Sequence, residues 1–486
     1  MNHSPSNPHR LFAAGFMAIL TASVGFSIRG GMLGDWGTQF GFTQTELGQI
    51  TGGGLVGFGM VVMIGAFLAE AVGYGRLMVC AFICHLLSAV VTLAATPLYA
   101  ARLAADPIAA RHVAYQCLYW GMFLFAVGNG LAEAVANPLV ATLFPKQKTR
   151  FLNILHAGWP AGLVIGGLAS AWMVGQVRWE IQMSLFLIPV AFYGAMCLGQ
   201  RFPHSEARTK GITPVRMFVE FASPLLLLLL FIQALGGYVE LGTDSWISNI
   251  TGNLLQSKEQ GLYLFVYVSV LMTGLRFLAG PIVHRISPLG LLFVSACIGA
   301  CGLTLLGHAG SAFALVGAAT IYAVGKTFLW PTMLGVVSER FPKGGAIVIG
   351  AVGAVGTLSA GLLGTPGIGY QQDRFASEEL REKSPAVYEQ YQAPTTNSFL
   401  FFKPIRGLDG SKVNPIRTKP ALERTDEERA VHEADLLGGR MALRATAALP
   451  VLMALLFLAL LLYFKAIGGY RALHVEDEPA PPIPDI

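Results

Sequence analysis

The chain has 486 residues, of which 54% are hydrophobic and only 13% are charged. This composition excludes a soluble globular protein, and 57 glycines are typical of helices that pack closely in a bilayer. The net charge of +5 is modest and the basic residues fall mostly in short links, which argues against a nucleic-acid-binding surface. We therefore expect an all-α integral membrane protein.

Twelve stretches are apolar over the length that a membrane-spanning helix needs, which is about 20 residues. In chain order, we predict spans at 11–35, 45–69, 77–99, 113–143, 151–175, 180–200, 219–249, 259–283, 288–308, 311–338, 345–370 and 440–464. The links on one side of the membrane are richer in Lys and Arg, including Lys146, Lys148, Arg150 and Lys343. Positive residues gather on the cytoplasmic side, so we expect a multi-pass protein of the cytoplasmic (inner) membrane with both termini cytoplasmic.

The sequence also repeats itself. Leu143-Phe-Pro-Lys146 follows the fourth span and Arg340-Phe-Pro-Lys343 follows the tenth, while Cys80/Cys84 in the third span match Cys297/Cys301 in the ninth. These repeats predict two pseudo-symmetric six-helix bundles. We assign 1–200 to the first bundle, 201–218 to a cytoplasmic linker, 219–464 to the second bundle and 465–486 to a disordered cytoplasmic tail. The cysteine pairs are interpreted as packing residues, so no metal site is expected.

Residues 371–439 form a polar insert between the last two spans, on the periplasmic or extracellular side. Thr425-Asp-Glu-Glu428 matches a capping box for a helix that leads into the twelfth span. The rest of the insert is expected to be irregular. A lid, a partner-binding site and a tolerated insertion are all compatible with it, and we favour the last.

Polar side chains occur inside the fourth and fifth spans. Asn129, Glu133 and Asn137 are spaced by four and share one helical face, and Asn153, His156 and Trp159 follow. Such groups are costly in hydrocarbon and usually face a bundle interior or a wet cavity. We interpret this face as one wall of a substrate path, with Glu133 as a proton-binding group or, alternatively, as a structural partner of a cation or helix end.

The second half carries a matching set of polar and aromatic residues. Gln233, Glu240 and Asp244 share a face of the seventh span. Tyr322, Lys326 and Trp330 share a face of the tenth. Lys326 is expected to bind substrate hydroxyls or to pair with Glu133 or Glu240. Arg276 in the eighth span has the same two possible roles, Arg29 is expected to reach the membrane surface, and Asp244 is either a functional acid or simply solvated. The tryptophans either stack on a sugar or anchor the span ends.

The chain resembles the major facilitator superfamily. Residues 66–73 (AFLAEAVG) are similar to its loop motif between the second and third spans, which implies a gating role for Glu70, Gly73 and Arg76. Glu133-Ala-Val-Ala-Asn137-Pro138, followed by Asn153 and His156, resembles the fucose/galactose/glucose–proton symporter (fucose permease-like) branch. That resemblance implies that Glu133 takes part in proton coupling and sugar binding.

We therefore expect a secondary active transporter that moves a small polar solute, a monosaccharide by preference, by alternating access coupled to H⁺. Its partners would be the solute and the lipid bilayer, with no nucleic acid, and the chain would act as a monomer without a cofactor. Transport of an organic anion or drug-like solute held by Lys326, Arg276 and Arg29, or a transport-dead solute sensor with 371–439 as its ectodomain, are the alternatives. HExxH, GxSxG and CxxC motifs are all missing from the sequence, so we do not expect an enzyme.

Overall fold

The computed structural model describes residues 7–40, 44–173, 176–204, 206–209, 211–393, 396 and 398–473. Most of the predicted tail, residues 474–486, lies outside the described residues. The first half of the chain forms the helices α1 (Pro8–Gly31), α2 (Leu33–Phe40), α3 (Gln44–Val72), α4 (Tyr74–Leu93), α5 (Ala95–Leu103), α6 (Pro107–Leu143), α7 (Lys148–His156), α8 (Gly158–Met173), α9 (Trp179–Ser184) and α10 (Leu187–Cys197).

A link of three short helices leads to the second half. It contains α11 (Glu206–Thr209), α12 (Pro214–Phe218) and η1 (Val219–Ala222). The second half forms α13 (Pro224–Gly237), η2 (Tyr238–Gly242), α14 (Thr243–Leu255), α15 (Lys258–Phe277), α16 (Ala279–Leu306), α17 (Ala312–Lys326), α18 (Leu329–Arg340), η3 (Pro342–Gly344), α19 (Gly345–Ser359), η4 (Ala360–Gly364), α20 (Thr365–Lys383), α21 (Pro385–Tyr391), α22 (Gly410–Thr418), η5 (Ala421–Glu423), α23 (Asp426–Thr446) and α24 (Ala448–Ala466).

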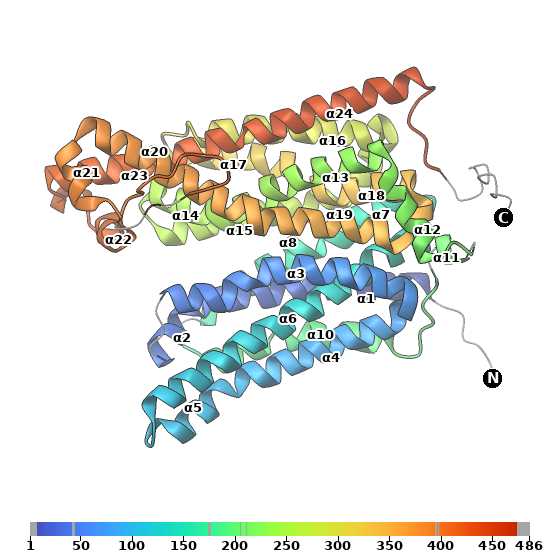
Figure 1. Cartoon of the computed structure of the whole chain (residues 1–486), viewed down its shortest axis with the longest axis horizontal. Coiled ribbons are helices and arrows are strands. Elements are labelled where there is room, and N and C mark those ends of the chain that lie inside the picture. Colours follow the sequence, from blue (N-terminus) through green and yellow to red (C-terminus); the bar gives the residue numbers. More distant parts are fainter. Residues whose placement is uncertain are drawn as a thin grey trace.

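Twelve segments of the described chain are long and apolar enough to cross a membrane, which confirms the predicted number of spans. Figure 1 shows the two halves as separate layers of helices that run in the same general direction. Each half has its own large hydrophobic core: one is built almost entirely from α1–α10 and the other mainly from α13–α24. This is the two-bundle fold that the internal repeats predict.

The two described ends of the chain lie at the same end of the bundles (Figure 1). The backbone N–H of Asn7 donates to Gln200 at 3.1 Å, and that of Leu473 donates to the carbonyl of Glu339 at 2.8 Å. We call this end the terminal face. The opposite end carries α20–α23 and is called the insert face. An even number of spans places both described ends of the chain on one side. That this side is cytoplasmic stays a prediction from the loop charges.

The repeat also appears in local backbone geometry. Phe144 ends α6 with φ −126° and ψ 61°, and Phe341 ends α18 with φ −127° and ψ 57°. Each phenylalanine is followed by a proline and then a basic residue. The proline ends the helix because it lacks an N–H and disfavours helical geometry in the residue before it. Equivalent sequences therefore end equivalent spans in the two halves.

The seventh and eleventh spans are each interrupted by a π-helical turn, η2 and η4, and the two turns pack together. Glycines allow this approach. A Cβ on Gly242 would lie 2.8 Å from the Cα of Gly364, and a Cβ on Gly237 would lie 2.0 Å from the carbonyl oxygen of Gly356. The backbones of the two spans therefore touch where their helical geometry changes, which fixes the insert-face half of one span against that of the other.

Replacing Gly237 with alanine is expected to lower stability by about 1–3 kcal/mol, the usual cost of overpacking, because the atoms in the way are backbone and cannot rotate aside. The matched control is Gly317→Ala on α17, where nothing lies within 4 Å of the new Cβ. Thermal unfolding of the purified variants in detergent measures the difference. Equal midpoints for the two variants would contradict the close backbone contact.

The insert is folded, so the prediction that it is mostly irregular is wrong. Helices α20 and α23 continue the spans on either side of it, and α21 and α22 lie between them. A small separate core holds the four together; it contains Leu380, Tyr388, Val413, Ile416, Val431 and Ala434. The predicted capping box is confirmed: Glu428 N–H donates to Thr425 Oγ1 at 3.2 Å, and Thr425 N–H donates to Glu428 Oε2 at 2.8 Å.

Candidate functional site

A cavity lies between the two halves of the molecule. Both halves supply its walls, which contain Phe58, Glu133, His156, Trp159, Glu240, Leu241, Arg276, Trp330 and Thr357. Several of these residues sit where a helix is interrupted: His156 is the last residue of α7, and Glu240 and Leu241 belong to the π-helical turn η2. Interrupted spans are a common way to place polar groups at the centre of a transporter.

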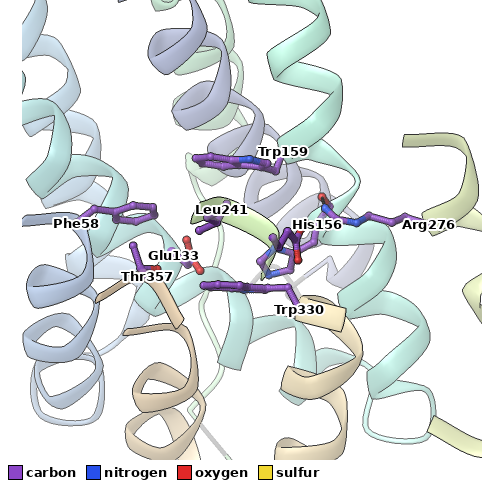
Figure 2. Close-up of a pocket in the computed structure, with 9 residues that line it drawn as sticks. Phe58, Glu133, His156, Trp159, Leu241, Arg276, Trp330 and Thr357 are labelled. Atoms are coloured by element: carbon purple, nitrogen blue, oxygen red, sulfur yellow. Dashed lines mark hydrogen bonds and ion pairs between the residues drawn. The ribbon is translucent and has the colours of Figure 1, made fainter. Parts of the chain in front are cut away.

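Glu133 projects into this cavity from α6 (Figure 2). Its Oε1 accepts a long hydrogen bond of 3.5 Å from the amide of Asn137, one turn further along the helix. Asn137 in turn contacts the Nε2 of His156 through its Oδ1 at 2.9 Å. Within the described part of the chain, Glu133 is buried and makes no ion pair. The structure therefore brings together three of the residues that the sequence placed on or beside this wall, Glu133, Asn137 and His156.

Arg276 forms the centre of the opposite wall. Its Nη2 donates to Glu240 Oε1 at 2.8 Å, and both side chains are almost fully buried. Its Nε donates to the carbonyl oxygen of Thr327 at 3.0 Å, and its Nη1 donates to the carbonyl oxygen of His156. Thr327 directly follows α17 and His156 is the last residue of α7, where carbonyl groups lack helical partners. Arg276 thus neutralises Glu240 and also joins the second half to the first.

Lys326 is fully buried and pairs with Asp244, so the predicted pairing with Glu133 or Glu240 is wrong. The alternative that Asp244 is merely solvated is wrong as well. Tyr322, one turn before Lys326, is also fully buried and donates from its hydroxyl to the carbonyl oxygen of Val239 at 2.6 Å. Lys326 and Tyr322 therefore bind the interrupted seventh span through Asp244 and Val239, and neither is among the residues that line the cavity.

Two tryptophans face each other across the cavity, one from each half (Figure 2). Trp159 belongs to α8 and stacks on Phe58, with ring centroids 6.5 Å apart and an interplanar angle of 16°. Trp330 belongs to α18. Their place at the cavity excludes the interpretation of these two residues as anchors at the ends of spans. Trp246 has a structural role, because its indole N–H donates to the carbonyl of Thr365 at 2.8 Å.

Three predicted site residues lie elsewhere. Asn129 contacts the Nε2 of His85 at 2.9 Å inside the first bundle. Asn153 donates to Thr332 Oγ1 at 3.1 Å, on the terminal-face side of the cavity. Gln233 is buried beside Gly356 and is not among the residues that line the cavity.

Arg29 does not reach the membrane surface, which corrects the prediction. It is buried in the first bundle, with its guanidinium 3.7 Å from the ring centroid of Phe125 and a 2.9 Å hydrogen bond to Ser88 Oγ. Arg29 is therefore not part of the anion site suggested by the alternative function.

Sequence reasoning missed Phe58, Leu241 and Thr357. Phe58 lies in a glycine-rich stretch of α3, and Thr357 is one of few hydroxyl groups in α19. An aromatic ring among glycines was a usable signal, because glycine leaves the space that such a ring fills. Leu241 carried no comparable signal, since leucine is common throughout the spans.

The halves are tied together at the terminal face. Glu70 Oε1 accepts from the backbone N–H of Ala346 at 2.8 Å, at the start of α19. Thr149 Oγ1 donates to Glu339 at 2.6 Å, and Lys148 Nζ donates to the carbonyl of Ser338 at 3.1 Å. In Figure 1 the ribbons of the two halves separate toward the opposite end. This structure is therefore closed at the terminal face.

The other two residues of the predicted gating loop have simpler positions. Gly73 separates α3 from α4 with φ +94°, a conformation that glycine adopts readily. Arg76 is exposed. Among the contacts of the described residues, only Glu70 of the three makes the contact between halves that a gating role requires.

Comparisons with known proteins agree with this architecture. The proton:xylose symporter XylE, bound to 6-bromo-6-deoxy-D-glucose, matches with a TM-score of 0.67 at 12% identity, over 93% of this chain and 95% of that chain. The E. coli fucose:proton symporter FucP matches with a TM-score of 0.60 at 15% identity, over 92% and 98%. The human organic anion transporter MFSD10 (TETRAN) matches with a TM-score of 0.59 at 13% identity, over 93% and 99%. At these identities the likeness shows the fold alone.

A curated relative, the cis,cis-muconate transport protein of Acinetobacter baylyi (strain ATCC 33305 / BD413 / ADP1), is 30% identical over 69 residues. The match spans 14% of this chain and only 17% of the relative. The family model described as Major Facilitator Superfamily matches residues 15–365. This match covers most of the chain, and the chain is therefore a transporter that belongs to the Major Facilitator Superfamily.

Proposed function

We propose that this transporter moves a small neutral polar solute, of the monosaccharide or polyol class, across the cytoplasmic membrane together with H⁺. The observation that carries the proposal is the unequal pairing of the three acids at and beside the cavity, Glu133, Glu240 and Asp244. Asp244 is neutralised by Lys326 and Glu240 by Arg276, whereas among the described residues Glu133 has only the amide of Asn137. An ionised carboxylate is costly in such surroundings without a cation, so a proton is the natural partner of Glu133.

The neutral charge of the solute follows from the same pairs. The guanidinium of Arg276 already donates to Glu240, Thr327 and His156. An anionic solute would have to displace Glu240 from it and would also lie near the carboxylate of Glu133. A neutral solute avoids both costs.

The opposed rings of Trp159 and Trp330 support a sugar-like solute. A sugar ring presents C–H groups on its faces and hydroxyl groups at its edge. Between two indole faces, the hydroxyls would point toward Glu133, His156 and Thr357, all of which line the cavity. Since the two indoles belong to different halves, a bound ring would contact both halves at once, as alternating access requires.

The test uses the purified chain in proteoliposomes that contain a trapped pH dye. Each member of a panel of monosaccharides, polyols and dicarboxylates, including cis,cis-muconate, is added outside in turn. We expect acidification with one or a few neutral solutes and none with the dicarboxylates. Acidification with a dicarboxylate alone would favour the organic-anion alternative. Radiolabelled uptake of the panel without any pH change would show transport without H⁺ coupling.

A further inference from the structure

An exposed aromatic segment lies within the insert. We define the aromatic loop as residues 398–403, which follow α21 and precede α22. Phe401 is 87% exposed and Leu400 is 63% exposed, which is unusual for large apolar side chains beside each other on a polar insert. Its other aromatic residues face inward: Phe399 and Phe402 have ring centroids 5.9 and 5.6 Å from that of Tyr370.

The backbone of the loop directs Leu400 and Phe401 outward and directs Phe399 and Phe402 toward Tyr370. Leu400 has φ +49°, a left-handed conformation that a leucine rarely adopts. The hydroxyl of Tyr370 donates to the carbonyl oxygen of Lys403 at 2.6 Å, which ties the end of the loop to α20. Phe401 stacks on Phe402 with centroids 4.8 Å apart, so its outward position is supported by a fixed neighbour.

The depth of the loop can be estimated along the eleventh span. Gly364 touches Gly242, which is two residues beyond Glu240 in the seventh span. Gly367, against which Phe399 packs, is three residues further, and Tyr370 is six. At about 1.5 Å per helical residue, these positions lie roughly 5–9 Å beyond Gly364 toward the insert face. Half of the hydrocarbon core is about 15 Å, and transporter sites lie near its midplane.

The loop therefore packs against the part of the span that is still inside the bilayer. The chain of the insert folds back beside α20 at this point, since Phe399 lies at Gly367 and close to Tyr370. Lys403, which follows the aromatic residues, is exposed and is placed to meet lipid headgroups. Tyr238, the other neighbour of Gly367, is not among the residues that line the central cavity.

We propose that the aromatic loop is a membrane anchor: Leu400 and Phe401 insert into the acyl chains of the bilayer at the insert face and hold the folded insert against the lipid surface. Interfacial aromatic residues commonly serve this purpose in membrane proteins. The anchor also links the insert to the insert-face halves of the seventh and eleventh spans, because Phe399 packs at Gly367 beside Tyr238. The insert is thus a membrane-bound cap on the second bundle.

The test measures the depth of residue 401 in the full chain, reconstituted in phosphatidylethanolamine/phosphatidylglycerol vesicles with the six native cysteines replaced by serine. A spin label is placed at Phe401→Cys, at Leu422→Cys on the exposed tip of the insert and at Leu455→Cys on the lipid-facing side of α24. Relaxation by oxygen reports lipid, and relaxation by a water-soluble nickel chelate reports water. The quantity compared is the ratio of the oxygen effect to the nickel effect at each label. We expect this ratio at 401 to resemble that at 455 and to exceed that at 422 at least tenfold.

A label at 401 with the aqueous behaviour of 422 would overturn the proposal and would leave the loop as a surface for a protein partner. A second measurement avoids the cysteine substitutions. In the native chain, Phe401→Asp is expected to lower the thermal midpoint in lipid nanodiscs, while Leu422→Asp leaves it unchanged. Equal midpoints for the two variants would also overturn the anchor.

Discussion

Replacing Glu133 with glutamine is expected to abolish solute-driven H⁺ entry while exchange of solute across the membrane continues. Glutamine keeps the shape of the protonated side chain and its contact with Asn137, but it cannot release a proton. The variant should then change between its two open states only when solute is bound. In proteoliposomes, we expect the initial rate of acidification to fall at least tenfold, which corresponds to about 1.4 kcal/mol or more, with counterflow of labelled solute retained.

The matched control is Glu427→Gln, which removes an exposed carboxylate from α23 in the insert. This variant is expected to acidify at the rate of the unchanged protein. Acidification by Glu133→Gln at the control rate would remove Glu133 from the coupling mechanism. Loss of counterflow as well would indicate that Glu133 mainly holds the solute.

Replacing Arg276 with methionine is expected to have the largest effect on stability. The change leaves Glu240 as a buried charge without a cation and also leaves the carbonyl groups of His156 and Thr327 without this donor. Removing one partner of a buried pair typically costs about 3–5 kcal/mol. We expect a lower thermal midpoint in detergent and no measurable uptake.

Two further variants show whether loss of the Arg276–Glu240 ion pair causes the loss of stability. The double variant Arg276→Met/Glu240→Gln removes both charges and is expected to recover much of the stability but none of the uptake. Arg178→Met breaks an exposed pair with Glu180, where the arginine side chain is 73% exposed, and should cost less than about 1 kcal/mol. If Arg276→Met were as stable as Arg178→Met, the central pair would not be a structural tie between the halves.

The twelve spans and the two-bundle plan could be predicted because they depend on local sequence. Hydrophobic length defines a span, and the Phe-Pro motifs that end α6 and α18 give the same backbone angles in both halves. The wall formed by Glu133 and Asn137 was also predictable, since a spacing of four places residues on one face of an uninterrupted helix.

The pairing of charges was harder to predict because it depends on contacts between spans. Glu240 and Asp244 share one face of an ideal helix, and the sequence therefore suggested one site for both. The π-helical turn η2 changes the register between them, and Glu240 meets Arg276 while Asp244 meets Lys326.

Asn129 and the insert show two other limits. Asn129 shares the polar face of α6, but the partner that satisfies it, His85, comes from α4, and the spacing along α6 contains no information about that helix. In the insert, the apolar residues are too sparse to show a regular period, yet they meet in one small core once α20 and α23 lie side by side.

The closed terminal face affects how tightly a solute is held. Hydrogen bonds made there by Glu70, Lys148, Thr149 and Asn153 must break before the cavity opens to that side. Each of these bonds contributes about 0.5–1.5 kcal/mol, so opening costs several kcal/mol. This cost is subtracted from the free energy that the solute gains from its contacts. The measured affinity of a transported solute will therefore be lower than its contacts suggest. A competitive inhibitor that fills the space between Trp159 and Trp330 and leaves the terminal face closed does not break these hydrogen bonds. Its dissociation constant should be tenfold smaller for each 1.4 kcal/mol or so of opening free energy that is avoided.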